Sequence, residues 1–157
     1  MPRYAESTTV PSDRSRTEIE ATLRRYGAGS YAYAWDGSQA MIGFVAHGRQ
    51  VRFAVPLPDP TSEEFTLTDT GRTRTPAAAK AAYEQSVRQR WRALALVIKA
   101  KLEAVDAGIT VFEDEFLAHI VLPDGRTVGD TVRPAVAQAY LTGKVPSLLA
   151  IGPGSSA

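Results

Sequence analysis

The residues of this 157-residue chain best suited to chemistry are cationic and lie in the stretch RQRWRALALVIKAK, residues 88–101. Placed at 100° per residue on a helix, Arg88, Arg92 and Lys99 fall within about 40° of one another. Guanidinium and ammonium groups in such a row suit the phosphates of a nucleic-acid strand. The row therefore predicts a phosphate-binding surface. A core helix with a solvated basic side is the alternative, and it also accounts for Trp91, which falls on the apolar side.

Charge is segregated along the chain, although the net charge is only +1. Residues 72–101 hold eight cationic side chains and one acidic one, and residues 102–130 hold seven acidic side chains and one cationic one. A basic surface can therefore exist on a nearly neutral protein. Arg72 and Arg74, at the start of the basic block, are predicted to join it. Alternatively, the two blocks neutralise each other within the fold or across a dimer.

Aromatic side chains offer a second candidate surface. In the stretch SYAYAWDG, Tyr31, Tyr33 and Trp35 alternate with alanine, so they share one face of an extended strand. If that face were open and included Arg52, it would resemble the aromatic platforms on which single-stranded bases stack. If it were covered, the three rings would be core residues. We expect the covered arrangement, because the intervening alanines would make a poor core.

Catalytic and metal-binding patterns are sparse. The chain has no cysteine, which excludes thiol catalysis and zinc–thiolate sites, and its two histidines are His47 and His119. Glu115 lies four residues before His119, and with Glu113 or Asp114 it could hold a divalent cation; a solvated acidic face with one histidine is the commoner arrangement. The stretch GAGSYA lacks the lysine of a phosphate-binding loop. We therefore expect no enzyme: no catalytic residue, no metal and no cofactor.

The first half of the chain predicts a helix followed by three strands. Residues 15–18, Ser-Arg-Thr-Glu, have the form of a capping box, so we expect a helix over 16–26. The strands are expected within 29–57. They are joined at Asp36-Gly37 and at Gly48, which predicts an antiparallel meander.

A polar segment and a long helix are expected next. Residues 58–75 are predicted to form a long excursion with one short strand at Phe65–Thr68. The helix follows over 76–106, with Pro76 in its first turn. Its apolar stripe has spacings of 4, 3, 4, 4 and 3 residues, which predicts a single core-facing side. The stripe consists of Val87, Trp91, Leu94, Ile98, Leu102 and Val105.

Two short helices are expected near the end of the chain. Thr110-x-x-Glu113 has the capping-box form and opens the first, which places three apolar side chains on one face. A turn at Pro123-Asp124-Gly125 precedes the second helix, expected over 131–141 with Pro134 in its first turn. The apolar side chains of the first helix are Phe112, Phe116 and Ile120.

The order of elements predicts an α+β fold: an N-terminal helix, a three-stranded antiparallel meander, a long amphipathic helix and two short C-terminal helices around an αβββα core. We expect one domain, residues 1–143, and an apolar, flexible tail over 144–157. Helices should cover one face of the sheet and leave the other open unless something else covers it. No stretch approaches the roughly 18 apolar residues of a membrane span, and the first residues lack a secretory signal, so we expect no membrane contact and a cytoplasmic location.

Two stretches, YAESTTVPSDRSRTEIEATLRRYGA and RWRALALVIKAKLEAVDAGITVFEDEFLAHIVLPDGRTVGD, resemble a group of small uncharacterised proteins of tailed phages and prophages. The likeness spans most of the chain and is weaker over 58–75 and in the tail. It implies an origin in a virus or mobile element and brings no catalytic residues. The αβββα order is also similar to that of double-stranded RNA-binding domains, although PAAAKAAYE stands in place of the lysine-rich start of their second helix.

The resemblance and the basic residues together predict a nucleic-acid-binding accessory protein of phage DNA metabolism, of the replication or recombination type. It would be non-catalytic and would act as a homo-oligomer in the cytoplasm of the host cell. The alternative is an anti-defence inhibitor that binds a host protein or a small signalling molecule, through the acidic residues 113–115 or through the apolar tail.

Overall fold

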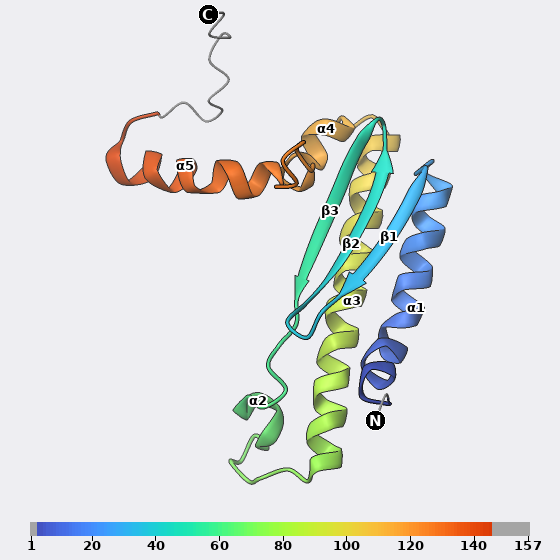
Figure 1. Cartoon of the computed structure of the whole chain (residues 1–157), viewed down its shortest axis with the longest axis vertical. Helices are drawn as coiled ribbons and strands as arrows, with labels where there is room; N and C mark the ends of the chain where they lie inside the picture. Colours follow the sequence, from blue (N-terminus) through green and yellow to red (C-terminus); the bar gives the residue numbers. More distant parts are fainter. Residues whose placement is uncertain (1–2, 146–157) are drawn as a thin grey trace, which may run out of the picture.

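The computed structural model describes residues 3–145, with side chains from Asp13 onward, and it has the predicted α+β architecture (Figure 1). No helix within this range is long and apolar enough to cross a membrane. In chain order the elements are α1 (Arg3–Arg25), β1 (Ser30–Trp35), β2 (Gln39–Ala46), β3 (Arg49–Pro56), α2 (Glu63–Thr66), α3 (Pro76–Asp106), α4 (Phe112–Glu115), a 3₁₀ turn (Leu117–His119) and α5 (Val128–Thr142).

The three strands form an antiparallel meander in the order β1-β2-β3, as predicted. Asp36 holds the first turn: its Oδ1 accepts hydrogen bonds from the backbone N–H groups of Ser38 and Gln39, at 2.8 and 2.9 Å. The second turn consists of His47 and Gly48, at φ 51° and 71°. Two consecutive positive φ values are typical of a type I′ hairpin turn, whose twist matches that of the flanking strands.

α1 and α3 pack side by side on one face of the sheet, and the core lies between these two layers. Because hydrophobic side chains from helices and strands meet there, the interior excludes water. The largest fully buried side chains are Ile19, Leu23, Ile42, Phe44, Val51, Trp91, Ile98 and Phe116.

α3 begins and ends where the sequence predicts. The Thr75 hydroxyl accepts a hydrogen bond of 3.2 Å from the backbone N–H of Ala78, and Pro76 occupies the first helical turn, where its missing N–H costs nothing. The predicted apolar stripe is confirmed. Val87, Trp91, Ile98 and Leu102 are buried, and Leu94 and Val105 are partly buried against the core.

The opposite face of the sheet carries no described helix and faces the viewer in Figure 1. Its residues are mostly small or apolar, and Arg52 is the one charged side chain among the described strand positions on this face. We call this surface the open face. Its small and apolar residues are Ala32, Ala34, Met41, Gly43, Val45 and Ala54.

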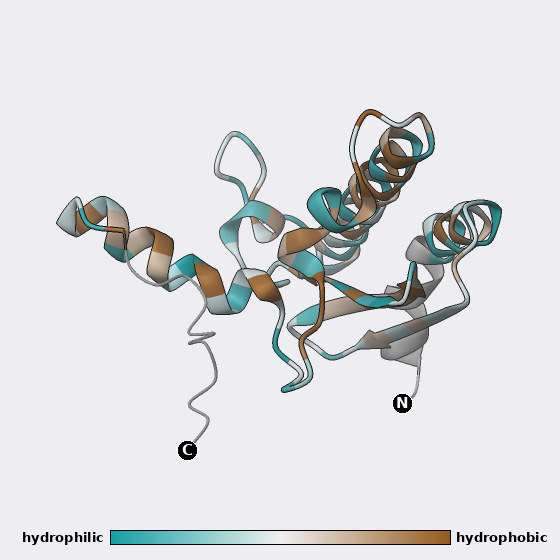
Figure 2. Cartoon of the chain, turned by 90° about the horizontal axis from the view of Figure 1, so that it is seen from above, coloured by the Kyte–Doolittle hydropathy of each residue, from teal (hydrophilic) through white to brown (hydrophobic). Residues whose placement is uncertain are grey.

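α5 extends away from the rest of the chain (Figures 1 and 2). All 15 of its residues are described, and none is buried. Its base is nevertheless held against the 3₁₀ turn: the backbone N–H of Val128 donates to the Ile120 carbonyl at 2.9 Å, and a Cβ added at Gly129 would lie 2.8 Å from the Ala118 carbonyl oxygen. The direction of α5 is therefore fixed at its base.

Two predictions about the first half of the chain are wrong. α1 begins at Arg3 rather than at residue 16, so residues 15–18 lie inside the helix and do not cap it. Instead of a strand over 65–68, the chain forms α2, followed by a single bridge from Leu67 to Thr73. The Ser62 hydroxyl caps α2, and two glutamates occupy its first turn; these helix-start signals outweigh the strand propensity of the segment.

The last two helices also differ at their starts. Thr110 does not cap α4, whose N-cap is Val111 without a side-chain hydrogen bond. The three apolar side chains expected on one face, Phe112, Phe116 and Ile120, are all buried. α5 begins at Val128, because Thr127 and Asp130 form a reciprocal capping box. Pro134 therefore lies inside the helix, beyond its first turn. The predicted tail lies outside the described residues from position 146 onward.

Candidate nucleic-acid interface

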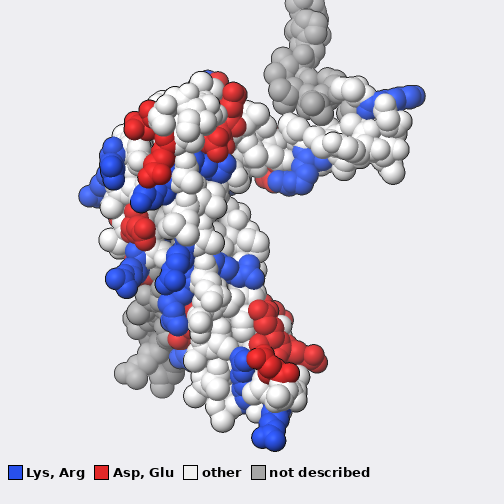
Figure 3. Space-filling model, turned by 180° about the vertical axis from the view of Figure 1, so that it is seen from behind, with Lys and Arg blue, Asp and Glu red and all other residues white. Residues whose placement is uncertain are grey.

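Arg88 and Arg92 project from the exposed side of α3, one helical turn apart, which is about 6 Å along the helix axis. Neither side chain makes a hydrogen bond or ion pair with the other residues that the structure describes. Lys99 lies about 10 Å further along the same side, with its Nζ 4.0 Å from Oε1 of Glu103. Figure 3 shows Lys and Arg atoms along this side of the molecule. We call these three residues the basic row.

The other cations of the same stretch hold the fold together. Arg90 donates a hydrogen bond of 3.1 Å from Nη1 to the carbonyl of Pro56, at the end of β3. Lys101 donates from Nζ to both the backbone carbonyl and the side chain of Glu115, each at 3.1 Å. The predicted basic stretch therefore divides into two sets, and only part of it is available to a ligand.

The basic and acidic blocks meet at one end of α3. Lys101 pairs with Glu115 there, and Arg49 of β3 pairs with Glu113 at 2.6 Å. At this end of α3 the basic and acidic blocks therefore neutralise each other, which is the alternative interpretation of the charge pattern. This neutralisation does not extend to Arg88 and Arg92 among the described contacts.

Arg72 and Arg74 lie in the loop before α3. Arg72 is exposed, whereas Arg74 is partly buried and donates from Nη1 to the Phe65 carbonyl at 3.4 Å. Because the 12 residues from Pro76 to Arg88 span about 18 Å of helix, these arginines lie well before the basic row along the axis of α3. They could lengthen the row, but the structure does not cluster them with it.

Tyr31 and Tyr33 are half-buried on the covered face of the sheet, as expected from the alanines between them. The Tyr33 ring centroid is 5.4 Å from that of Trp91, and the Arg16 guanidinium carbon lies 4.2 Å from the Tyr33 centroid. Burial raises the pKa of both tyrosine hydroxyls. Trp35, at the end of the strand, is 38% exposed. The two tyrosine rings therefore do not form an open platform on which bases could stack.

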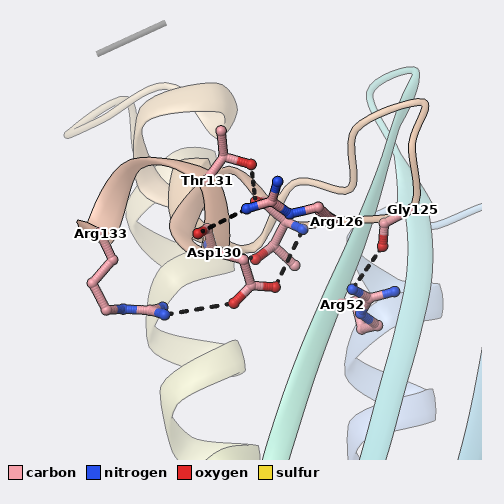
Figure 4. Close-up of polar contacts among 7 residues, drawn as sticks. Arg52, Gly125, Arg126, Asp130, Thr131 and Arg133 are labelled. Atoms are coloured by element: carbon pink, nitrogen blue, oxygen red, sulfur yellow. Dashed lines mark hydrogen bonds and ion pairs between the residues drawn. The ribbon is translucent and has the colours of Figure 1, made fainter. Parts of the chain in front are cut away.

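Arg52 points from the open face, on the other side of the sheet from α3 (Figure 4). Its Nη2 donates a hydrogen bond of 2.9 Å to the carbonyl of Gly125, in the turn that precedes α5. Arg52 thus fixes this turn against the sheet. The structure does not bring it together with the basic row.

The acidic residues and histidine considered for a metal site have other partners. Glu115 binds Lys101, and the His119 ring stacks on Phe53 with centroids 4.0 Å apart. Burial, and then the nearby Lys101 charge, lowers the pKa of His119, so its imidazole is neutral at pH 7. No group of three or more histidine, aspartate or glutamate side chains that could hold a metal ion occurs within the described part of the chain.

α1 adds arginines outside the basic block of residues 72–101. Arg14 and Arg25 are exposed on the helix that packs beside α3, while Arg24 pairs with Glu20 at 2.6 Å. The adjacent pair Arg24-Arg25 in the last turn of a helix was the available signal. This pair bears on the candidate interface only because α1 packs next to α3, which the sequence does not show.

Compared with known proteins, this chain matches no family model, no curated protein and no solved structure. The candidate site therefore rests on the geometry of the structure and not on a known relative. Two exposed arginines stand one helical turn apart without described partners, and a lysine follows on the same side of a helix whose other side is firmly packed.

Proposed function

We propose that the protein binds nucleic acid through the basic row, as a non-catalytic accessory protein of phage DNA metabolism. One observation carries the binding proposal: Arg88 and Arg92 are exposed, adjacent and without partners among the described residues, although nearby Arg90 and Lys101 are engaged. The phage setting rests on the resemblance of two stretches of the sequence.

The dimensions of the row suit a phosphate backbone. From Arg88 to Lys99 it spans about 16 Å of helix, and one strand of a duplex presents about five phosphates over that length. Arginine can bind a phosphate with two parallel hydrogen bonds, which adds direction to the electrostatic attraction. Counterions released from the nucleic acid would supply much of the binding free energy.

Binding at this row would be largely independent of base sequence. The ring nearest to it in the chain, Trp91, is 1% exposed, and Tyr31 and Tyr33 lie between the sheet and the helices. No aromatic ring of these three can then stack on a base. Phosphate contacts alone fix position and orientation but carry no direct sequence information.

The inhibitor alternative finds less support in the acidic block. Glu113 and Glu115 are each paired with a cation, so two of the three carboxylates that would form its surface are already engaged. The apolar tail, its other proposed surface, begins at Lys144 and lies mostly outside the described residues. The contacts therefore favour nucleic acid over an acidic docking site.

Charge reversal within the row tests the proposal. Arg88→Glu/Arg92→Glu should lower the affinity for labelled DNA in fluorescence anisotropy by at least about tenfold, since each lost charge-assisted contact is worth about 1.5 kcal/mol or more. Arg133→Glu/Lys144→Glu, with the same change of net charge at exposed positions in and after α5, is the matched control and should retain most of the affinity. A folded row variant that binds as tightly as the unmodified protein would refute the assignment.

A further inference from the structure

A second row of charged side chains lies on α1. Arg14, Glu18 and Arg25 are all exposed. At 100° per residue they fall within about 40° of one another, on the side of α1 away from the buried Ile19 and Leu23. We call these three residues the α1 row. Its spacing of 4 and 7 residues is the same as that of the basic row, so each row spans about 16 Å.

The basic row lies on the side of α3 that borders α1. Arg90 and Lys101 lie on the other flank of the apolar stripe, and their hydrogen bonds to Pro56 and Glu115 place that flank beside β3 and α4. The basic row is roughly 140° to 180° away from these two cations around the helix. α1 packs on that other side of α3 (Figure 1). The basic row therefore borders the seam between α1 and α3, where Figure 3 shows Lys and Arg atoms over both helices.

The two rows lie at the same level along the helices. The Tyr33 ring marks this level, because its centroid is 5.4 Å from that of Trp91 in α3 and 4.2 Å from the guanidinium carbon of Arg16 in α1. α1 and α3 run in the same direction (Figure 1). The α1 row then extends from about 3 Å before this level to about 14 Å beyond it, and the basic row from about 4 Å before it to about 12 Å beyond it.

The two rows together carry a net positive charge. They contain five cations, three in the basic row and two in the α1 row, and one acid, Glu18. The remaining charged side chains in the described part of α1 pair with each other, Arg16 with Asp13 at 3.1 Å and Arg24 with Glu20 at 2.6 Å. The seam is thus a cationic strip that is two rows wide, and its charge is not neutralised by the helices that form it.

Two rows suit two strands. The axes of packed helices lie about 8 to 10 Å apart. The two backbones of B-DNA border a minor groove about 6 Å wide and a major groove about 12 Å wide, so side chains from the two rows can reach one backbone each. A single strand would follow one row only, and proteins usually hold single strands by stacking the bases on aromatic rings. The aromatic side chains in the described part of the two helices, Tyr83 and Trp91, are both buried.

We propose that the ligand is a double-stranded nucleic acid that lies along the seam, with one strand on the basic row and the other on the α1 row. This inference rests on the proposed function, because it assigns the second half of the same interface. Over about 16 Å each strand presents about five phosphates, and the rows place two or three cations beside them. Glu18, in the middle of the α1 row, repels the phosphates of its strand and weakens this contact.

Charge reversal on α1 tests the second row. In fluorescence anisotropy with a labelled DNA duplex of about 16 base pairs, Arg14→Glu/Arg25→Glu should lower the affinity at least about tenfold, because two charge-assisted contacts are lost. Arg133→Glu/Lys144→Glu, which makes the same change of net charge outside both rows, is the matched control and should retain most of the affinity. The unmodified protein should bind the labelled single strand at least about tenfold more weakly than the duplex, because one row is then unused.

Glu18→Gln should change the affinity in the opposite direction. Glu18 is exposed, so the variant should keep the fold. Loss of its repulsion should raise the affinity for the duplex about threefold, the size expected for an interaction between exposed charges. Asp114→Asn, which removes an exposed acid on α4 outside both rows, is the matched control and should leave the affinity unchanged. Because a gain of affinity cannot come from unfolding, an unchanged or lower affinity of Glu18→Gln would contradict the α1 row.

The results would distinguish a wrong α1 row from a wrong proposed function. Duplex affinity that falls in Arg88→Glu/Arg92→Glu and is unchanged in Arg14→Glu/Arg25→Glu would keep the basic row and overturn the second one. A single strand bound as tightly as the duplex would also overturn the inference. If neither DNA binds to the unmodified protein, the proposed function itself fails, and the inference fails with it.

Discussion

Arg126 donates a hydrogen bond of 3.3 Å to the main-chain carbonyl of Asp130, the carbonyl that Pro134 leaves without its helical partner (Figure 4). A proline inside a helix removes the N–H that would reach four residues back, at a cost of about 3 kcal/mol or more. Here a side chain from the preceding turn supplies the missing donor. This contact helps to explain how α5 continues through Pro134 and projects as far as it does.

The pairing of Arg126 with Pro134 predicts a coupled effect. Arg126→Ala should lower the free energy of opening at the base of α5 by about 1 kcal/mol, because a carbonyl loses its donor. In a Pro134→Ala background the helix supplies that donor itself, so the same change should cost clearly less. Hydrogen exchange of the α5 amides would measure the cost of Arg126→Ala in the two backgrounds, which together form a double-mutant cycle. Equal costs in the two backgrounds would mean that the contact does not compensate for the proline.

Gly129→Ala should destabilise the protein, although glycine-to-alanine changes usually stabilise helices. Gly→Ala inside a helix is normally worth up to about 1 kcal/mol of added stability. At Gly129 the new Cβ would lie 2.8 Å from the Ala118 carbonyl oxygen, so α5 must shift away from the 3₁₀ turn. We expect Gly129→Ala to lower the melting temperature, with Gln138→Ala, at an exposed α5 position, as the neutral comparison. A raised melting temperature for Gly129→Ala would show that the base of α5 is loosely held.

His119 should make stability depend on pH. Burial lowers its pKa from the ordinary value of 6.5. Below pH 6.5 the unfolded chain therefore takes up a proton that the folded chain resists, and the free energy of unfolding falls as the pH drops toward the folded pKa. Urea unfolding between about pH 7.5 and 5 should show a smaller loss of stability in His119→Gln. Identical pH profiles for the two proteins would mean that His119 protonates as readily in the fold as outside it.

Tyr33 should matter for stability and not for ligand binding. Tyr33→Ala removes a ring that packs on Trp91 and lies under the Arg16 guanidinium, which should cost about 2 kcal/mol in urea unfolding. Because the ring faces the helices, the folded variant should bind nucleic acid as the unmodified protein does. Weaker binding at unchanged stability would instead assign Tyr33 to the ligand surface.

Local patterns in the sequence were sufficient for much of the fold. Pro76, a regular apolar stripe and Gly108 define α3 to the residue, since each signal acts within a few positions of its effect. The turn at Asp36-Gly37 likewise positions β1 against β2. The starts of α1, α4 and α5 were mispredicted and α2 was taken for a strand, because several serines, threonines and acids compete as caps and local sequence does not choose among them.

The candidate site was predictable only in part. The spacing of Arg88 and Arg92 placed them on one side of a helix, and they are both exposed. Sequence could not show that Arg90, two residues from each, would bind the end of β3, because that contact joins positions 34 residues apart. The hydrogen bond from Arg52 to Gly125 could not be predicted for the same reason, because it joins positions 73 residues apart.

The most direct test of nucleic-acid binding by the basic row is the salt dependence of its affinity. Fluorescence anisotropy with labelled single-stranded DNA, double-stranded DNA and double-stranded RNA, each at about 50 and 200 mM salt, would measure it. Three phosphate contacts to duplex DNA predict a loss of about 40-fold in affinity over that range, and Arg88→Glu/Arg92→Glu should abolish most of this dependence. Absence of binding at the lower salt, or an unchanged salt dependence in the double variant, would contradict the account.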